Sequence, residues 1–122
     1  MTAPSIWDEE FITNWDEPLT RVHVSGRSMG WCEWCGKEKA AEKHHRINRS
    51  QGGKWHPANI IDLCGADHRA VTVNPEWAQS VGLAIPGHPQ ISPSAVPVRN
   101  RPNRQPDLWL HDNYLPAGKN MR

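Results

Sequence analysis

Three cysteines, two of them in the motif Cys32-x-x-Cys35, constrain the fold of this chain most. An odd number argues against a disulfide framework, and the N-terminal stretch MTAPSIWDEE is acidic and lacks the apolar segment of a signal peptide. Hydrophobic residues make up only 37% of the 122 residues, so the available core is small. No run approaches the ~20 apolar residues that span a membrane. We therefore expect one metal-stabilised domain in a reducing cytoplasm.

Two adjacent histidines, His44 and His45, lie in the stretch EKHHRINRSQGG at residues 42–53. Successive side chains of a strand point to opposite faces, so the two imidazoles cannot both face one core. Six lysines and arginines but only two glutamates fall within residues 37–54, although the net charge of the whole chain is +1. An anion, a metal ion or both would resolve the repulsion among these groups. Such a basic block suits phosphate, or it forms an ordinary solvated surface.

The chain divides into an acidic segment at 1–20, a motif-bearing core at 21–74 and a Pro-rich extension at 75–122. Apolar residues at helical spacing in the first segment predict a short helix that ends before Pro18. The later segments predict the following elements: a short strand at the start of 21–36 leading into the cysteine knuckle, a strand within 40–47, a loop at 48–57 with a tight turn at Gly52-Gly53, a strand and a helix within 57–72, a helix at 75–81, and a strand pair around 112–113.

The polar residues recur in the pattern HH…N-x-x-x-LC-x-x-x-H, which starts at His44-His45, continues through Asn59 and Cys64, and ends at His68. This pattern resembles the HNH endonuclease family and, in detail, the small HNH proteins that bacteriophages encode near DNA-packaging genes. The likeness covers about residues 28–74. It implies an α+β fold with a small ββα-metal core (the HNH, or His-Me, finger), a zinc knuckle, and irregular N- and C-terminal extensions.

The resemblance also implies roles for the polar residues. His45 corresponds to the general base, and Asn59 to a residue that ties the loop between the strands and positions that base. His44 and His68 correspond to ligands of one catalytic divalent ion (Mg, Mn, Ni or Zn), and Thr72 to a further ligand found in some relatives. A neutral imidazole takes a proton from water, and a divalent ion neutralises charge on the phosphoryl group.

A structural zinc site is implied as well, with four ligands: Cys32, Cys35, Cys64 and Asp67. Relatives often carry a fourth cysteine where this chain has Asp67. A carboxylate is a permitted zinc ligand, but His23 or His56 could take its place. A redox-active Cys-x-x-Cys is the other interpretation, although no thioredoxin-like pattern surrounds the motif.

The expected nucleic-acid contacts are electrostatic, since phosphate contacts position a protein without reading sequence. Four cations of the motif block are predicted to bind backbone phosphate: Arg46, Arg49, Lys54 and Arg69. Trp55 either belongs to the core or stacks on a base. The arginines within residues 99–104 form either a DNA-contacting arm or a solvated linker.

The sequence therefore predicts an endonuclease that nicks or cuts DNA, with low sequence specificity, in the cytoplasm of a bacterial host. Its partners would be DNA and a terminase or other packaging protein. Two alternatives stay open. The chain could be a zinc-binding, terminase-associated packaging module with little intrinsic cleavage, or a toxin or restriction-type effector.

Overall fold

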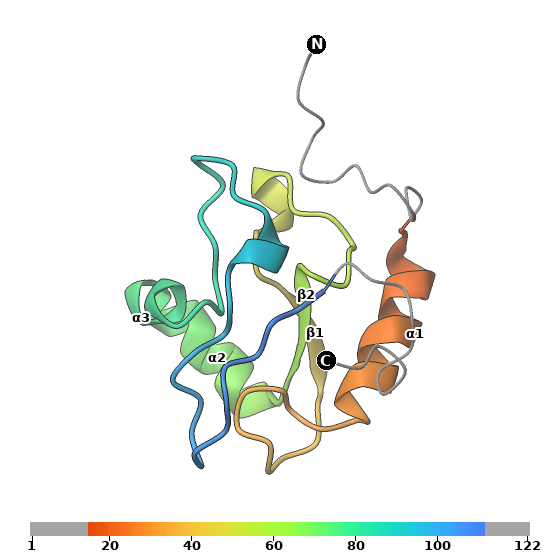
Figure 1. The fold of residues 1–122 in the computed structure, drawn as a ribbon, viewed down its shortest axis with the longest axis vertical. Helices are drawn as coiled ribbons and strands as arrows, with labels where there is room; N and C mark the ends of the chain where they lie inside the picture. The colour runs from red at the N-terminus through yellow and green to blue at the C-terminus, as the bar shows by residue number, and fades with distance from the viewer. Residues whose placement is uncertain (1–14, 112–122) are drawn as a thin grey trace.

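The structure, a computed structural model, describes residues 15–111. Short elements joined by long loops make up this part of the chain (Figure 1). In chain order they are helix α1 (Glu17–Ser28), strand β1 (Glu42–His45), the 3-10 turn η1 (Arg49–Gln51), strand β2 (Ile60–Leu63), helix α2 (Gly65–Val73), helix α3 (Pro75–Ser80) and the 3-10 turn η2 (Pro93–Ala95).

The two strands form an antiparallel hairpin at the centre of the molecule, with His44 opposite Ile61 and His45 opposite Ile60. Helix α1 lies beside the hairpin on one side, and α2 and α3 lie on the other (Figure 1). Both Ile60 and Ile61, which point to opposite faces of β2, are fully buried, so both faces of this strand are covered. The β1–β2–α2 order is the ββα arrangement expected from the sequence, and the α+β class is confirmed.

The core is one cluster of apolar side chains that links the hairpin to α2, α3 and the C-terminal extension. Its members include Ile61 and Leu63 of β2, Val71 of α2, and Val98 and Leu110 of the extension. Val98 and Leu108 exchange two backbone hydrogen bonds of 2.8 Å. The irregular extension is therefore part of the packed domain, although it contains little regular secondary structure.

The prediction of a short strand after residue 20 was wrong, because this segment belongs to helix α1. The Asp16 side chain accepts a hydrogen bond from the backbone N–H of Leu19 at 2.9 Å and so caps the helix, and Pro18 lies in its first turn. Thr20 and Val24, one turn apart, form its buried face. Pro18 therefore lies inside a helix instead of following one. Most of the helix expected before Pro18 lies outside the described residues.

The other predicted elements agree closely with the structure. Helix α3 ends at Ser80, one residue early, and is followed by Gly82 with a φ of 82°. Asn74 does not cap α3, because its side-chain amide donates to the carbonyl of Ala70 at 3.1 Å. In the loop between the strands, a Cβ atom at Gly53 would overlap the carbonyl oxygen of Ile47, which explains the glycine there. The strand pair expected around 112–113 lies outside the described residues.

Candidate active site

Strand alternation separates the two adjacent histidines. His44 and His45 end β1, and their side chains emerge on opposite faces of the hairpin. His44 faces α2 and the segment after α3, whereas His45 faces the inter-strand loop and α1. Each histidine therefore has its own surroundings at the same strand end.

The His44 face brings together three predicted metal-site residues. The imidazole rings of His44 and His68 lie 5.2 Å apart between centroids, and both line a cavity of about 360 Å³ together with Thr72. His68 and Thr72 are one turn apart on α2, and the Thr72 hydroxyl donates to the carbonyl of His68 at 3.1 Å. Two imidazoles and a hydroxyl thus share one hollow between β1, α2 and α3.

Hydrogen bonds on the far side of each ring decide which nitrogen faces the hollow. Nε2 of His44 lies 2.8 Å from the carbonyl oxygen of Leu83, which can only accept, so Nε2 carries the proton and Nδ1 keeps its lone pair. Nδ1 of His68 contacts the carboxylate of Glu42, which leaves Nε2 as the ring nitrogen that could bind an ion in the hollow. Burial lowers the pKa of His44 to about 4, so the ring is neutral near pH 7. Two imidazoles oriented in this way, with the His44 ring neutral, fit a divalent metal ion.

The His45 face differs in character. The His45 ring packs edge-on against the indole of Trp55, with 4.6 Å between ring centroids. Its Nε2 atom is buried and receives no hydrogen bond from residues 15–111. Burial lowers the pKa of His45, and the nearby cation of Arg49 lowers it further. A neutral imidazole with an unused ring nitrogen is therefore the favoured form.

Asn59 is fully buried and joins the two ends of the inter-strand loop. Its Oδ1 accepts from the backbone N–H of Ile47 at 2.8 Å, and its Nδ2 donates to the carbonyls of Ile47 and Lys54, both at 3.2 Å. Trp55 directly follows Lys54, so these bonds also hold the loop that brings Trp55 against His45. The Asn59 side chain therefore holds the loop in position, and none of its atoms is exposed to contact a substrate.

The cysteine cluster forms a second, separate site at the other end of the hairpin. Among the described residues, one group of three or more cysteine, histidine or carboxylate side chains has its ligand atoms within 4.8 Å of one another: Cys32, Cys35, Cys64 and Asp67. Cys64 caps α2, and the Asp67 carboxylate accepts from the thiols of Cys32 and Cys64 at 3.2 Å each. Asp67 therefore occupies the fourth position of the cluster.

The two histidines considered as alternative zinc ligands lie elsewhere. The rings of His23 and His56 both pack against Trp15, at centroid distances of 5.5 and 6.0 Å. Burial raises the pKa of the Cys32 thiol to about 12, whereas redox-active cysteines have lowered values. The donor set of three sulfurs and one carboxylate fits zinc, which binds thiolates and so offsets the cost of burying their charge.

The knuckle is attached to the rest of the domain by a buried ion pair. Arg27 of α1 donates to both carboxylate oxygens of Glu33, at 2.7 and 2.8 Å, and to the carbonyls of Pro57 and Ile60. Glu33 also accepts from the backbone N–H of Asp62 at 2.9 Å. Nothing in the local pattern around Glu33 predicted this role, because the partners of its carboxylate come from two other segments, α1 and β2.

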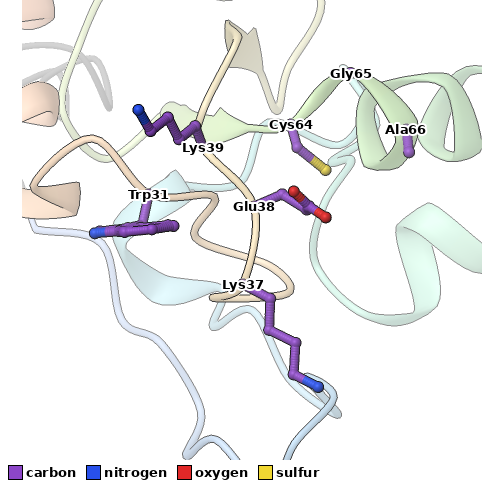
Figure 2. A pocket seen from close by; sticks show the side chains of 7 residues that line it. All are labelled: Trp31, Lys37, Glu38, Lys39, Cys64, Gly65 and Ala66. Carbon is purple, nitrogen blue, oxygen red and sulfur yellow. The ribbon is translucent and has the colours of Figure 1, made fainter.

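An open hollow of about 660 Å³ adjoins the knuckle at the start of α2 (Figure 2). In Figure 2 the side chains of Lys37 and Lys39 point away from each other, and the Glu38 carboxylate points toward Cys64 and Ala66. Trp31 lies at its edge and is about half exposed, at 47%. The lysines therefore do not converge on an anion at this helix end.

Arg46 departs from its expected role. Its side chain is buried, with 1% of the residue exposed, and its guanidinium donates to four backbone carbonyls. These belong to Ala58 (2.9 Å), Gly82 (2.8 Å), Pro93 (3.0 Å) and Val96. The prediction that Arg46 binds phosphate is therefore corrected: this arginine holds the hairpin to the C-terminal extension. Arg49, Lys54 and Arg69 are exposed.

Replacing Arg46 with methionine is expected to lower the free energy of unfolding by about 3 kcal/mol, because four buried carbonyls lose their donors. Urea unfolding of the zinc-loaded protein measures this effect. The matched control is Arg49→Gln, an exposed cation three residues away, which should change stability by less than about 0.5 kcal/mol. A stable Arg46→Met protein with weakened DNA binding would restore the phosphate-binding assignment.

Residues 32–73 match the family model described as HNH endonuclease. This range holds the whole ββα unit together with all four members of the cysteine cluster, while α1 and α3 lie outside it. Residues 32–73 are therefore similar to HNH endonuclease domains, and this match suggests metal-dependent nuclease activity on DNA. No curated protein and no solved structure matches the chain significantly. Within residues 15–111, no helix has the length and apolar character needed to cross a membrane.

Proposed function

We propose that the chain is a divalent-metal-dependent endonuclease that nicks or cuts DNA with low intrinsic sequence specificity. The observation that carries this proposal is the strand end of β1. There the His44–His68–Thr72 hollow and the half-buried ring of His45 lie on opposite faces of the hairpin, at two consecutive residues of β1. Phosphodiester hydrolysis needs charge neutralisation on one side of the phosphorus and a proton acceptor for water on the other.

In this mechanism His45 is the general base that takes the proton of the attacking water. Asn59 positions it by holding the loop against the strand end. His44 and His68, with Thr72, would hold the divalent ion, which supplies Lewis-acid stabilisation of the phosphoryl oxygens and the leaving oxygen. Mg, Mn, Ni and Zn are the candidate ions. The Glu42 carboxylate orients His68, and the Leu83 carbonyl orients His44.

DNA binding in this proposal is mainly electrostatic. The exposed cations Arg49, Lys54 and Arg69 would contact backbone phosphates, which position the duplex without reading its bases. A structural zinc at the cysteine cluster would hold the knuckle to the start of α2. We further propose a bacteriophage origin, action in the host cytoplasm, and a role beside a terminase or another packaging protein, all on the resemblance of the motif block.

The test is a plasmid assay. Supercoiled plasmid is incubated with the zinc-loaded protein and, in separate reactions, with Mg, Mn, Ni or added Zn. We expect nicked or linear product that depends on the added ion and disappears when His68→Ala replaces the wild type. Zinc content is measured in parallel, so that loss of the catalytic ion is separated from loss of the structural one. A folded, zinc-bound protein that cuts under none of these ions would contradict the proposal and favour a packaging accessory.

A further inference from the structure

Helix α1 lies outside the matched range, yet it reaches the His45 side of the candidate site. The guanidinium carbon of Arg21 lies 4.8 Å from the ring centroid of Trp55, and the His45 ring packs edge-on against the same indole, with 4.6 Å between ring centroids. A guanidinium, an indole and an imidazole therefore follow one another from α1 to the end of β1. This contact joins the N-terminal helix to the loop that Asn59 closes.

The Arg21 guanidinium is held in place but keeps unused donors. Its Nε donates to the carboxylate of Glu17, one turn earlier, at 2.8 Å. Among residues 15–111, neither of its two Nη groups has a hydrogen-bonding partner, and the side chain is 49% exposed. Trp55 on one side and Glu17 at Nε thus restrict the rotation of the planar group. Such a restricted fork loses less conformational freedom when it binds an anion than a freely moving side chain does.

The charges around His45 favour an anion at this place. Arg49 and Arg21 both lie close enough to act on the His45 ring, and Glu17, the one carboxylate within residues 15–111 that acts on it, is already paired with Arg21. A guanidinium matches the oxygens of a phosphate in a bidentate geometry. Because the ion pair with Glu17 is half exposed on both sides, it contributes little to stability by itself.

We propose that Arg21 binds a backbone phosphate of the DNA on the His45 side of the site, so that α1 extends the DNA-contacting surface beyond the HNH domain. This inference rests on the proposed function, because it assumes that DNA lies across the end of β1. Arg21 is then a substrate-binding residue contributed by a helix that the motif pattern does not include. Trp55 serves as the platform for its guanidinium.

The test is the salt dependence of DNA binding. Fluorescence anisotropy of a labelled duplex is measured between 50 and 200 mM salt, with zinc-loaded protein and no added divalent ion. Arg21→Gln should reduce the slope of log affinity against log salt by about one, and weaken binding roughly 3- to 10-fold near 100 mM salt. The matched control is Lys37→Gln, which also removes one positive charge, on the knuckle side of the molecule (Figure 2). Its slope should equal that of the wild type.

Two results would overturn the inference: an unchanged slope for Arg21→Gln, or an equal loss for Lys37→Gln, which would mean that only net charge matters. Thermal unfolding of both variants shows that they are folded. Failure of the proposed function is recognised separately, since the wild type itself would then show no salt-dependent binding and no cleavage. If the wild type binds and cuts DNA and Arg21→Gln behaves identically, only the proposed role of Arg21 is contradicted, and the proposed function stands.

Discussion

Replacing His45 with alanine is expected to lower the rate of plasmid cleavage by on the order of 100-fold or more, while the protein stays folded and keeps its zinc. The reason is the position of the ring. Burial and Arg49 keep the imidazole neutral, and its Nε2 accepts no bond from the described residues. Removal of the ring takes away the proposed proton acceptor but leaves the His44–His68–Thr72 hollow and the cysteine cluster in place.

The measurement is the initial rate of nicking at saturating divalent ion, compared with the affinity for DNA and the zinc content of the same preparation. His45→Gln is the second variant, because an amide of similar size can pack against Trp55 but cannot take a proton at neutral pH. His88→Ala is the matched control, since His88 is exposed on the C-terminal extension. Cleavage by both His45 variants at the wild-type rate would show that another group is the base.

Loss of the proposed structural zinc is expected to have the largest effect on stability. We expect about one tightly bound zinc per chain, and Cys35→Ser should lose it and destabilise the domain by on the order of 5 kcal/mol or more. The cluster joins the knuckle to the N-terminus of α2, and Trp34 beside Cys35 packs edge-on against Trp77 of α3 at 5.3 Å. Without the ion, weaker thiol–carboxylate hydrogen bonds of Asp67 would replace the metal–ligand bonds that join these segments.

Metal analysis and thermal unfolding measure both parts of this prediction. The discriminating variants are at Asp67. Asp67→Cys should retain zinc with four thiolates, whereas Asp67→Ala should release it faster to a chelator, because only three ligands remain. A wild-type protein that is folded and free of zinc would refute the structural zinc site. If the wild type and Asp67→Ala released zinc at the same rate, only the assignment of Asp67 as a zinc ligand would be wrong.

The ββα unit could be predicted because its signals are local. The strand around His44-His45, the glycine loop, the strand ending at Leu63 and the helix that follows it all come from short stretches of sequence. Helix α1 could not be predicted in the same way. The alternation in RVHV at residues 21–24 is compatible with a strand, and the helix was decided by the Asp16 cap and by the burial of Thr20 and Val24 one turn apart.

The sequence also did not show which charged side chains are buried. Arg46 belongs to a basic block and looks like its neighbours, but four carbonyls from residues 58–96 surround its guanidinium. Arg21 shows the opposite case, since its helix carries no part of the motif and its place beside Trp55 depends on how α1 packs. A charged side chain becomes structural or functional according to which distant segments meet it.

The sequence by itself determined the chemical types at both sites and the order of the central elements, because spacing and strand alternation act over a few residues. Only the tertiary structure decided that Asp67 completes the cysteine cluster, that Glu42 and Leu83 orient the histidines, and that Arg46 is internal. These contacts join residues up to 50 positions apart. Their formation depends on how the hairpin, helices and extension pack together, which no local pattern records.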